Sequence, residues 1–350
     1  MDLKKGFFES YYNKLPKKIK YSSFVYYNSL KLSKFIRNRN KSNKELDSQN
    51  YLLNMIFINS DIKFHGTLRN IQLLSLELLR FIDNVCRKYD LGYWLDFGTL
   101  LGAVRHGGFI PWDDDVDISM IRKDYDKLIE VLPKEIEKYD YLKENFCLTK
   151  RMKDNENYFK NSNDVFDIEN IDELRINNSH FLNIGWMKPT IVIDVFPRDY
   201  LLDDKFDYYK KMYEVRRYEF CSGLSLGEID FEDNFIKLNE ELGLVSYETS
   251  FVTLGVDTSN FLVDETTQMT ENIFPLNELK FENYNLKVPN NYDAFLKRLF
   301  GDYMKIPSSI VFPDNIIRFI ENQFDSKEEM DKSFEHAINS LKEINDNFEY

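Results

Sequence analysis

The chain has 350 residues, of which 43% are hydrophobic and 15% aromatic, a composition that supports a sizeable core and excludes a disordered protein. Its formal net charge is −13, and an acidic chain is a poor match for nucleic acid, so we expect no nucleic-acid partner. Three widely spaced cysteines exclude a zinc motif and a disulfide framework, and no apolar run reaches the ~18 residues of a membrane span.

The N-terminal residues differ in charge from the rest of the chain. Residues 1–44 contain twelve Lys or Arg and two acidic residues, interleaved with Phe and Tyr. They lack the hydrophobic centre of a secretory signal, so we expect a cytoplasmic protein. Basic and aromatic side chains together are typical of contact with an anionic lipid surface, here the inner face of the membrane. The alternative is a leader that packs elsewhere in the fold. Residues 45–65 are expected to form a linker.

The next part of the chain predicts alternating helices and strands. Apolar residues at helical spacing predict a helix over 67–89. A Gly-Thr sequence and a Gly-Gly turn bound a second, shorter helix. Alternation of acidic or Ser residues with Val, Ile and Met predicts a half-buried strand just before the third helix. The expected elements are a helix over 67–89, a strand over 93–97, a helix over 99–105, a strand over 115–120, and a helix from 122 that ends near Pro133.

The second half predicts two further strands and then mainly helices. The acidic segment 154–178 is expected to be a long excursion or lid. Strands are predicted over 181–185 and 190–196, the second closed by Pro197 and buried on both faces. Helices are predicted over 204–220, 291–303 and 327–345. The fold class is therefore α/β (α+β), with a catalytic core over 66–200 and a mostly helical region over 201–350.

Three acidic residues are the candidates for catalysis and metal binding. Asp115 and Asp117 lie two residues apart on a predicted strand, so both side chains leave the same face. Two close carboxylates repel unless a cation lies between them, and Mg²⁺, with Mn²⁺ as the alternative, suits oxygen ligands. The competing interpretation is a solvated turn or a weak calcium loop. Asp194 lies in an apolar strand, where it is either a third metal ligand, the general base, or an ion-pair partner of Arg198.

Several residues are candidates for holding phosphate. Gly98 permits a close approach of the backbone, and Thr99 opens a helix whose N–H groups can bind an anion. Three cations are candidate phosphate contacts, with a solvated surface position as the alternative for each: Arg105, Arg175 and Lys188. The three tryptophans near these motifs, Trp94, Trp112 and Trp186, are expected to pack in the core.

Longer stretches resemble a known family. Residues 93–105 (Tyr-Trp-Leu-Asp-Phe-Gly-Thr-Leu-Leu-Gly-Ala-Val-Arg) and 108–118 (Gly-Phe-Ile-Pro-Trp-Asp-Asp-Asp-Val-Asp-Ile) closely resemble the LicD family of phosphotransferases, to which fukutin is related. Residues 193–197 are similar to its third acidic block. Residues 299–304 are similar to its C-terminal block, with Phe300 where the family usually has Tyr. The resemblance covers roughly residues 66–307.

The resemblance implies a nucleotidyltransferase-like mixed sheet flanked by helices, with Asp115, Asp117 and Asp194 around magnesium. It also implies transfer of a substituted phosphate, phosphocholine from CDP-choline or an alditol phosphate, from a CDP-linked donor. The acceptor would be a hydroxyl of a cell-surface glycan or its precursor, as in lipopolysaccharide or teichoic acid. Two alternatives stay open: a nucleotidyltransferase that moves an NMP group, and a non-catalytic member that binds nucleotide or glycan within an assembly.

Overall fold

The computed structural model describes residues 66–150, 182–226, 229, 231–258, 263–306 and 313–350. The predicted leader, the predicted linker and the predicted excursion over 154–178 lie outside the described residues, and so does Arg175. None of the described helices combines the length and the apolar character needed to cross a membrane.

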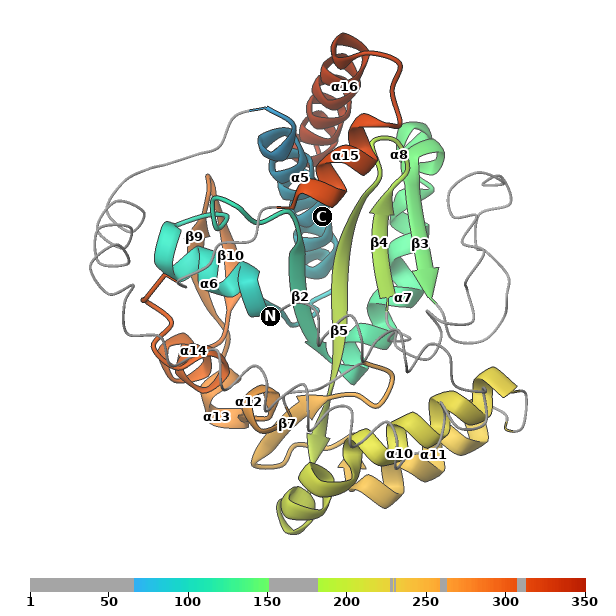
Figure 1. Ribbon diagram of the computed structural model, residues 1–350, viewed down its shortest axis with the longest axis vertical. Coiled ribbons are helices and arrows are strands. Elements are labelled where there is room, and N and C mark those ends of the chain that lie inside the picture. Colours follow the sequence, from blue (N-terminus) through green and yellow to red (C-terminus); the bar gives the residue numbers. More distant parts are fainter. Residues whose placement is uncertain (1–65, 151–181, 227–228, 230, 259–262, 307–312) are drawn as a thin grey trace, which may run out of the picture.

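A mixed sheet forms the centre of the molecule (Figure 1). Its main path runs β1-β2-β5-β4-β3, in which β2 and β5 are parallel and the other neighbours are antiparallel. The far end of β5 also pairs with β6 and β7, and β7 pairs with β8. These strands are β1 (Tyr93–Leu95), β2 (Val116–Ile121), β3 (Phe146–Lys150), β4 (Leu182–Trp186), β5 (Ile191–Leu201), β6 (Leu244–Val245), β7 (Phe251–Leu254) and β8 (Gln268–Met269). The expected mixed α/β fold is confirmed.

Helices pack around this sheet in three groups. The long helices α5 and α7 pack against β5, and α16 packs along α5. On the other side of β1, α6 contacts α14 and a two-stranded hairpin. The pair α10 and α11 forms a second, smaller hydrophobic cluster with the far end of β5. The bounds are α5 (Thr67–Lys88), α6 (Phe97–His106), α7 (Arg122–Ile136), α8 (Asp140–Asn145), α10 (Phe206–Leu226), α11 (Phe231–Leu242), α12 (Val263–Thr266), α13 (Thr270–Ile273), β9 (Asn277–Phe281), β10 (Tyr284–Val288), α14 (Tyr292–Phe300), α15 (Asp314–Glu321) and α16 (Lys327–Asp346).

The strand β5 corrects two predictions. It continues through Pro197 to Leu201, because Pro197 falls between two neighbours: β4 pairing stops at Val195 and β7 pairing starts at Arg198. No antiparallel neighbour therefore needs the amide hydrogen that proline lacks. The prediction that the strand is buried on both faces is also wrong. Burial alternates from Ile191 to Phe196, with Val192 38% exposed, so over this part of the strand one face is covered and the other is open.

The helix α7 also runs further than predicted. It continues past Pro133 to Ile136, although an internal proline removes one helical hydrogen bond. The residues around the proline explain this, because Leu132 and Ile136 are both buried in the main core. Their burial outweighs the lost bond. In the C-terminal region the three predicted helices appear as α10, α14 and α16, while strands β6–β8 and the hairpin β9–β10 were not predicted. The alternation of apolar and polar residues in β10 (Tyr-Asn-Leu-Lys-Val) is a signal that could have found the hairpin.

Candidate functional site

Two of the three predicted acidic residues lie side by side. Asp117 on β2 and Asp194 on β5 are Cα partners in the parallel pair, so their side chains leave the same face of the sheet. This is the face on which Val192 is exposed. Both aspartates are only partly buried, and Asp115, just before β2, is exposed. The strand register thus brings together residues 77 positions apart at an open surface.

The electrostatics of this face are unfavourable to its carboxylates. Burial raises the pKa of Asp117 well above its usual range, and the charges of Asp115 and Asp194 raise it further. Burial and Asp115 likewise raise the pKa of Asp113 to about 8, and the pKa of Asp114 rises to about 6 for the same reasons. A cation bound among these oxygens would remove the repulsion.

The donor set suits magnesium chemically, because carboxylate oxygens are the ligands that this ion prefers. Among the described residues, however, no group of three or more His, Cys, Asp or Glu side chains is arranged to hold a metal ion. The backbone register places Asp117 beside Asp194, and rotation of side chains on this open face would be enough to converge them. The residues therefore fit the ion in chemistry and in backbone position, and metal binding stays a prediction.

Two hydrogen bonds join the start of α6 to β2, the strand that carries Asp117. The Asp117 amide donates to Thr99 Oγ1 at 2.9 Å, and the Asp96 amide donates to the Asp117 carbonyl at 3.0 Å. Thr99 is buried. The hydrogen bond that its hydroxyl accepts from Asp117 is structural, in addition to any role toward phosphate. A Cβ atom on Gly98 would lie 2.9 Å from Asp113 Oδ2. The helix start and the carboxylates thus form one continuous site.

A buried ion pair that the sequence did not predict lies beside this helix start. Asp96 caps α6, with its Oδ1 accepting from the Phe97 amide at 2.7 Å. Its Oδ2 accepts from Ser119 Oγ at 2.5 Å and from the guanidinium of Arg198. The sequence analysis offered Arg198 as one possible ion-pair partner of Asp194. In the structure Arg198 pairs with Asp96 instead. The available signal was the position of Asp96 before Gly98 and Thr99, where an aspartate is a typical N-cap.

The predicted cations lie in different environments. Arg105 is 6% exposed, so it is not the solvated residue that the alternative expected, and its Nη1 donates to the Tyr303 carbonyl at 2.9 Å. Burial lowers its pKa to about 10. Lys188 is exposed, 4.7 Å from the centre of the Phe324 ring and 3.8 Å from Glu329. Arg105 therefore joins α6 to the C-terminal block, whereas Lys188 contacts the segment between α15 and α16.

The tryptophans follow their predicted role where they are buried. Trp94 and Trp186 are fully enclosed in the main core, as expected. Trp112 is partly buried, and its ring lies 6.2 Å from that of His106. Both buried tryptophans pack on aromatic rings of distant segments, Trp94 on Phe274 and Trp186 on Phe146, so they stabilise the sheet from which the site projects.

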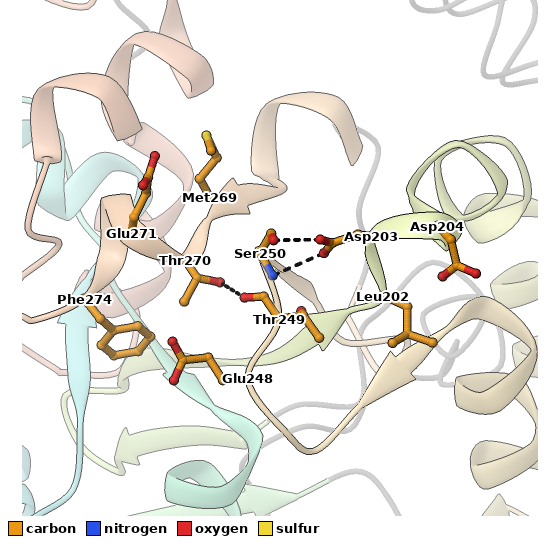
Figure 2. Close-up of a pocket in the computed structure, with 10 residues that line it drawn as sticks. All are labelled: Leu202, Asp203, Asp204, Glu248, Thr249, Ser250, Met269, Thr270, Glu271 and Phe274. Atoms are coloured by element: carbon orange, nitrogen blue, oxygen red, sulfur yellow. Dashed lines mark hydrogen bonds between the residues drawn. The ribbon is translucent and has the colours of Figure 1, made fainter.

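A pocket of about 950 Å³ lies at the other end of β5 (Figure 2). Asp203 accepts hydrogen bonds from the Ser250 amide and hydroxyl across it, and Thr270 Oγ1 donates to the Thr249 carbonyl. None of the predicted site residues lines it. The residues that do are Leu202, Asp203, Asp204, Glu248, Thr249, Ser250, Met269, Thr270, Glu271 and Phe274. The acidic face with Asp117 and Asp194 is therefore a separate feature.

Comparison with known proteins agrees with this geometry. A family model described as "LicD/FKTN/FKRP, nucleotidyltransferase domain" matches residues 90–205. Lipopolysaccharide cholinephosphotransferase LicD of Haemophilus influenzae is 24% identical over 248 residues, which cover 69% of this chain and 92% of that protein. Ribitol 5-phosphate transferase FKRP of Homo sapiens is 46% identical over 48 residues, 14% of this chain and 10% of that protein. The matched region carries the parallel strands, the helix start and all three acidic residues, so residues 90–205 form a nucleotidyltransferase domain of the LicD type, to which fukutin is related.

Proposed function

We propose that this protein transfers a substituted phosphate, phosphocholine or an alditol phosphate, from a CDP-linked donor to a hydroxyl of a cell-surface glycan or its precursor. The observation that carries the proposal is the pairing of Asp117 with Asp194 beside the start of α6, within the matched family region. Its relatives support the reaction type, since one is named a cholinephosphotransferase and another a ribitol 5-phosphate transferase.

Each part of the site has a role in this proposal. Asp115, Asp117 and Asp194 would hold Mg²⁺ or Mn²⁺, which when bound supplies positive charge for the diphosphate of the donor. The amides of Gly98 and Thr99 at the start of α6 bind phosphate oxygens. Asp194, on the open face of β5, orients the acceptor hydroxyl and accepts its proton. The protein mainly positions the reactants and supplies preorganised charge.

The three cations have supporting roles. The guanidinium of Arg105 is buried at the far end of α6, where Asp113 is close enough to influence its pKa. It therefore supplies positive charge close to Asp113, beside the acidic residues of the site. Lys188 and Arg175 stay candidates for contact with the donor, Lys188 from an exposed position before β5.

A panel of donors tests the proposal. The protein is incubated with CDP-choline, CDP-ribitol and CDP-glycerol, with and without a glycan acceptor and with and without Mg²⁺, and the released product is identified. Release of CMP that depends on the cation supports the proposal. Release of pyrophosphate from CTP and a phosphorylated acceptor would instead favour a nucleotidyltransferase. Binding of CDP-choline, seen as a raised melting temperature without any turnover, would favour a non-catalytic member.

We also propose that residues 1–44 bring the protein to the inner face of an anionic membrane, where a glycan precursor would be met. The support is their basic and aromatic composition. Sedimentation with vesicles that contain phosphatidylglycerol tests this, with the chain lacking residues 1–44 as the comparison. Equal sedimentation of both chains would contradict it.

A further inference from the structure

We propose that Arg198 is a positioning residue, which holds the carboxylate of Asp96 away from the Gly98 and Thr99 amides and so leaves those amides to the phosphate groups of the substrate. The inference rests on the proposed function, because it takes the start of α6 as the phosphate site. It assigns a task in the reaction to a buried ion pair that contacts no reacting atom itself.

The first observation is the unusual cap of α6. An aspartate at a helix N-cap normally accepts a hydrogen bond from the second or third amide of the helix. Here the Asp96 side chain accepts from Phe97, the first helical residue, at 2.7 Å. Gly98 and Thr99 are the second and third residues. The carboxylate therefore occupies the cap position without capping the two amides that it usually would.

The second observation explains what holds the carboxylate there. Its other oxygen accepts from Ser119 Oγ and from the Arg198 guanidinium. Arg198 is itself fixed, since its Nε donates to Ser119 at 3.2 Å and its Nη1 donates to the Thr266 carbonyl at 2.7 Å. Asp96 and Arg198 are 0% and 1% exposed. Hydrogen bonds to a buried carboxylate are strong, so this arrangement leaves Asp96 little freedom to rotate.

The third observation is the conformation of Phe97. Its φ of 41° lies in the left-handed region, which a non-glycine residue keeps only where its surroundings impose it. The Arg198 guanidinium lies 5.6 Å from the centre of the Phe97 ring, and the centre of the Phe196 ring lies 5.1 Å from that of Phe97. Arg198 therefore contacts both residues of the turn that aims α6 at the carboxylates.

Removal of Arg198 has a specific consequence. Asp96 would keep its charge in a buried place and would need other donors. Ser119 and the Phe97 amide already donate to it. The Gly98 and Thr99 amides are the donors that an N-cap aspartate normally uses, so the side chain would adopt the usual cap and compete with a phosphate for them. A residue that only stabilised the fold would produce the opposite effect on these amides, because destabilisation speeds their exchange with solvent.

Amide hydrogen exchange tests this without any ligand. The chain contains 13 glycines, so ¹⁵N-glycine labelling gives few NMR signals, and the Gly98→Ala variant identifies the signal of interest. In Arg198→Met the Gly98 amide should exchange about fivefold more slowly than in the wild type, the protection expected of a cap hydrogen bond. Unchanged or faster exchange in folded Arg198→Met would overturn the proposal.

A second variant keeps the test decisive if Arg198→Met does not fold. Ser119→Ala removes one hydrogen bond to Asp96 and should also slow exchange at Gly98, by a smaller factor. Unchanged or faster exchange in that variant would overturn the proposal equally.

Binding of inorganic pyrophosphate provides the second measurement. Calorimetry should show about tenfold weaker binding to Arg198→Met than to the wild type, and Arg198→Lys should recover part of the loss. The matched control is Arg122→Met, which removes another ion-paired arginine, one that bonds Asp199 on the opposite face of β5 from Arg198. Because this change destabilises the fold, it should not slow exchange at Gly98, and it should leave pyrophosphate binding by the folded protein unchanged. Equal losses in both variants would contradict the inference. A wild-type protein that does not bind pyrophosphate would count against the proposed function instead, while the exchange measurement still decides the role of Arg198.

Discussion

Two groups of carboxylates lie around the parallel strands β2 and β5, one near the start of the strands and one near their end. Near the start, Asp117 lies beside Asp194, and burial together with neighbouring carboxylates raises the pKa of Asp117. Near the end, Arg122 donates to Asp199 and to Asp257, each at 2.7 Å. Burial alone would lower the pKa of Arg122, but the two carboxylates outweigh it and raise that pKa. Arg122 thus brings a counter-charge into the second group.

The two groups differ in their counter-charge. The second group has an arginine between its carboxylates and stabilises the fold, whereas the carboxylates of the first group repel one another and suit a bound cation. In the second group the arginine is so closely enclosed that a Cβ atom on Gly255 would lie 2.1 Å from its Nη2. Both carboxylates of this group are buried and already paired with this arginine. In the first group, burial and neighbouring carboxylates act against the charge of Asp117, and such a perturbed pKa is common at functional sites. A cation, if bound there as we propose, would relieve this repulsion.

Replacement of Asp117 should have the largest effect. Asp117→Asn removes a central carboxylate of the first group, so turnover should fall by at least about 10³-fold. The melting temperature should stay equal or rise, because a repelled buried charge is lost. CMP release and thermal unfolding measure the two effects. Asp203→Asn, in the acidic pocket at the other end of β5, is the matched control and should keep wild-type turnover. Substantial activity in Asp117→Asn would contradict the metal assignment.

Replacement of Arg122 should lower the stability of the protein and leave its turnover nearly unchanged, the reverse of the effect expected for Asp117. Arg122→Met leaves Asp199 and Asp257 buried without their cation and should lower the free energy of unfolding by ~3–5 kcal/mol. Turnover of the folded protein at low temperature should stay close to the wild-type value, because the substitution lies away from the first group. Urea unfolding and CMP release measure these quantities. A variant that is stable but inactive would show that the two groups are not separate in function.

The pH dependence of stability should report on the first group in protein stripped of divalent cations. The pKa of Asp113 is raised from 3.8 to about 8, so between these values the folded state binds more protons than the unfolded state. The contribution of Asp113 to the free energy of unfolding is therefore fully present below pH 3.8 and is lost as the pH rises toward 8. Melting temperatures across this window measure the slope. Asp113→Asn should flatten it, and added Mg²⁺ should raise the melting temperature most at the alkaline end. A slope of the opposite sign would contradict this account.

Substitution of two glycines of α6 should have the smallest effects. One substitution should mainly lower the stability of the fold, and the other should mainly weaken donor binding. A Cβ on Gly102 would lie 2.5 Å from the Gly108 carbonyl, which is backbone, so Gly102→Ala should destabilise the fold by ~1–3 kcal/mol. A Cβ on Gly98 meets only the carboxylate end of Asp113, which can move. Gly98→Ala should therefore cost less stability than Gly102→Ala and mainly weaken donor binding. Denaturant unfolding and a CDP-choline titration distinguish them, and the reverse order of stabilities would contradict this interpretation.

Much of the core could be predicted from local patterns. The apolar period predicted α5 to within one residue, and alternation predicted β2. The Gly-Gly turn also appears, with Gly107 in the left-handed region that ends α6. Strands β6, β7 and β8 were not predicted because they are two to four residues long. Such strands are too short to show a period of two, and they form where a neighbouring edge is available: β6 and β7 pair with β5, and β8 pairs with β7.

The sequence by itself determined the family resemblance, the mixed α/β class and the identity of the acidic residues, because these depend on residue types at short spacing. Only the tertiary structure decided which charges meet. The register of β2 with β5 placed Asp194 beside Asp117, and the same register gave Arg198 to Asp96 instead of to Asp194. Strand pairing joins residues far apart in the chain, and local sequence carries little information about the register in which they join.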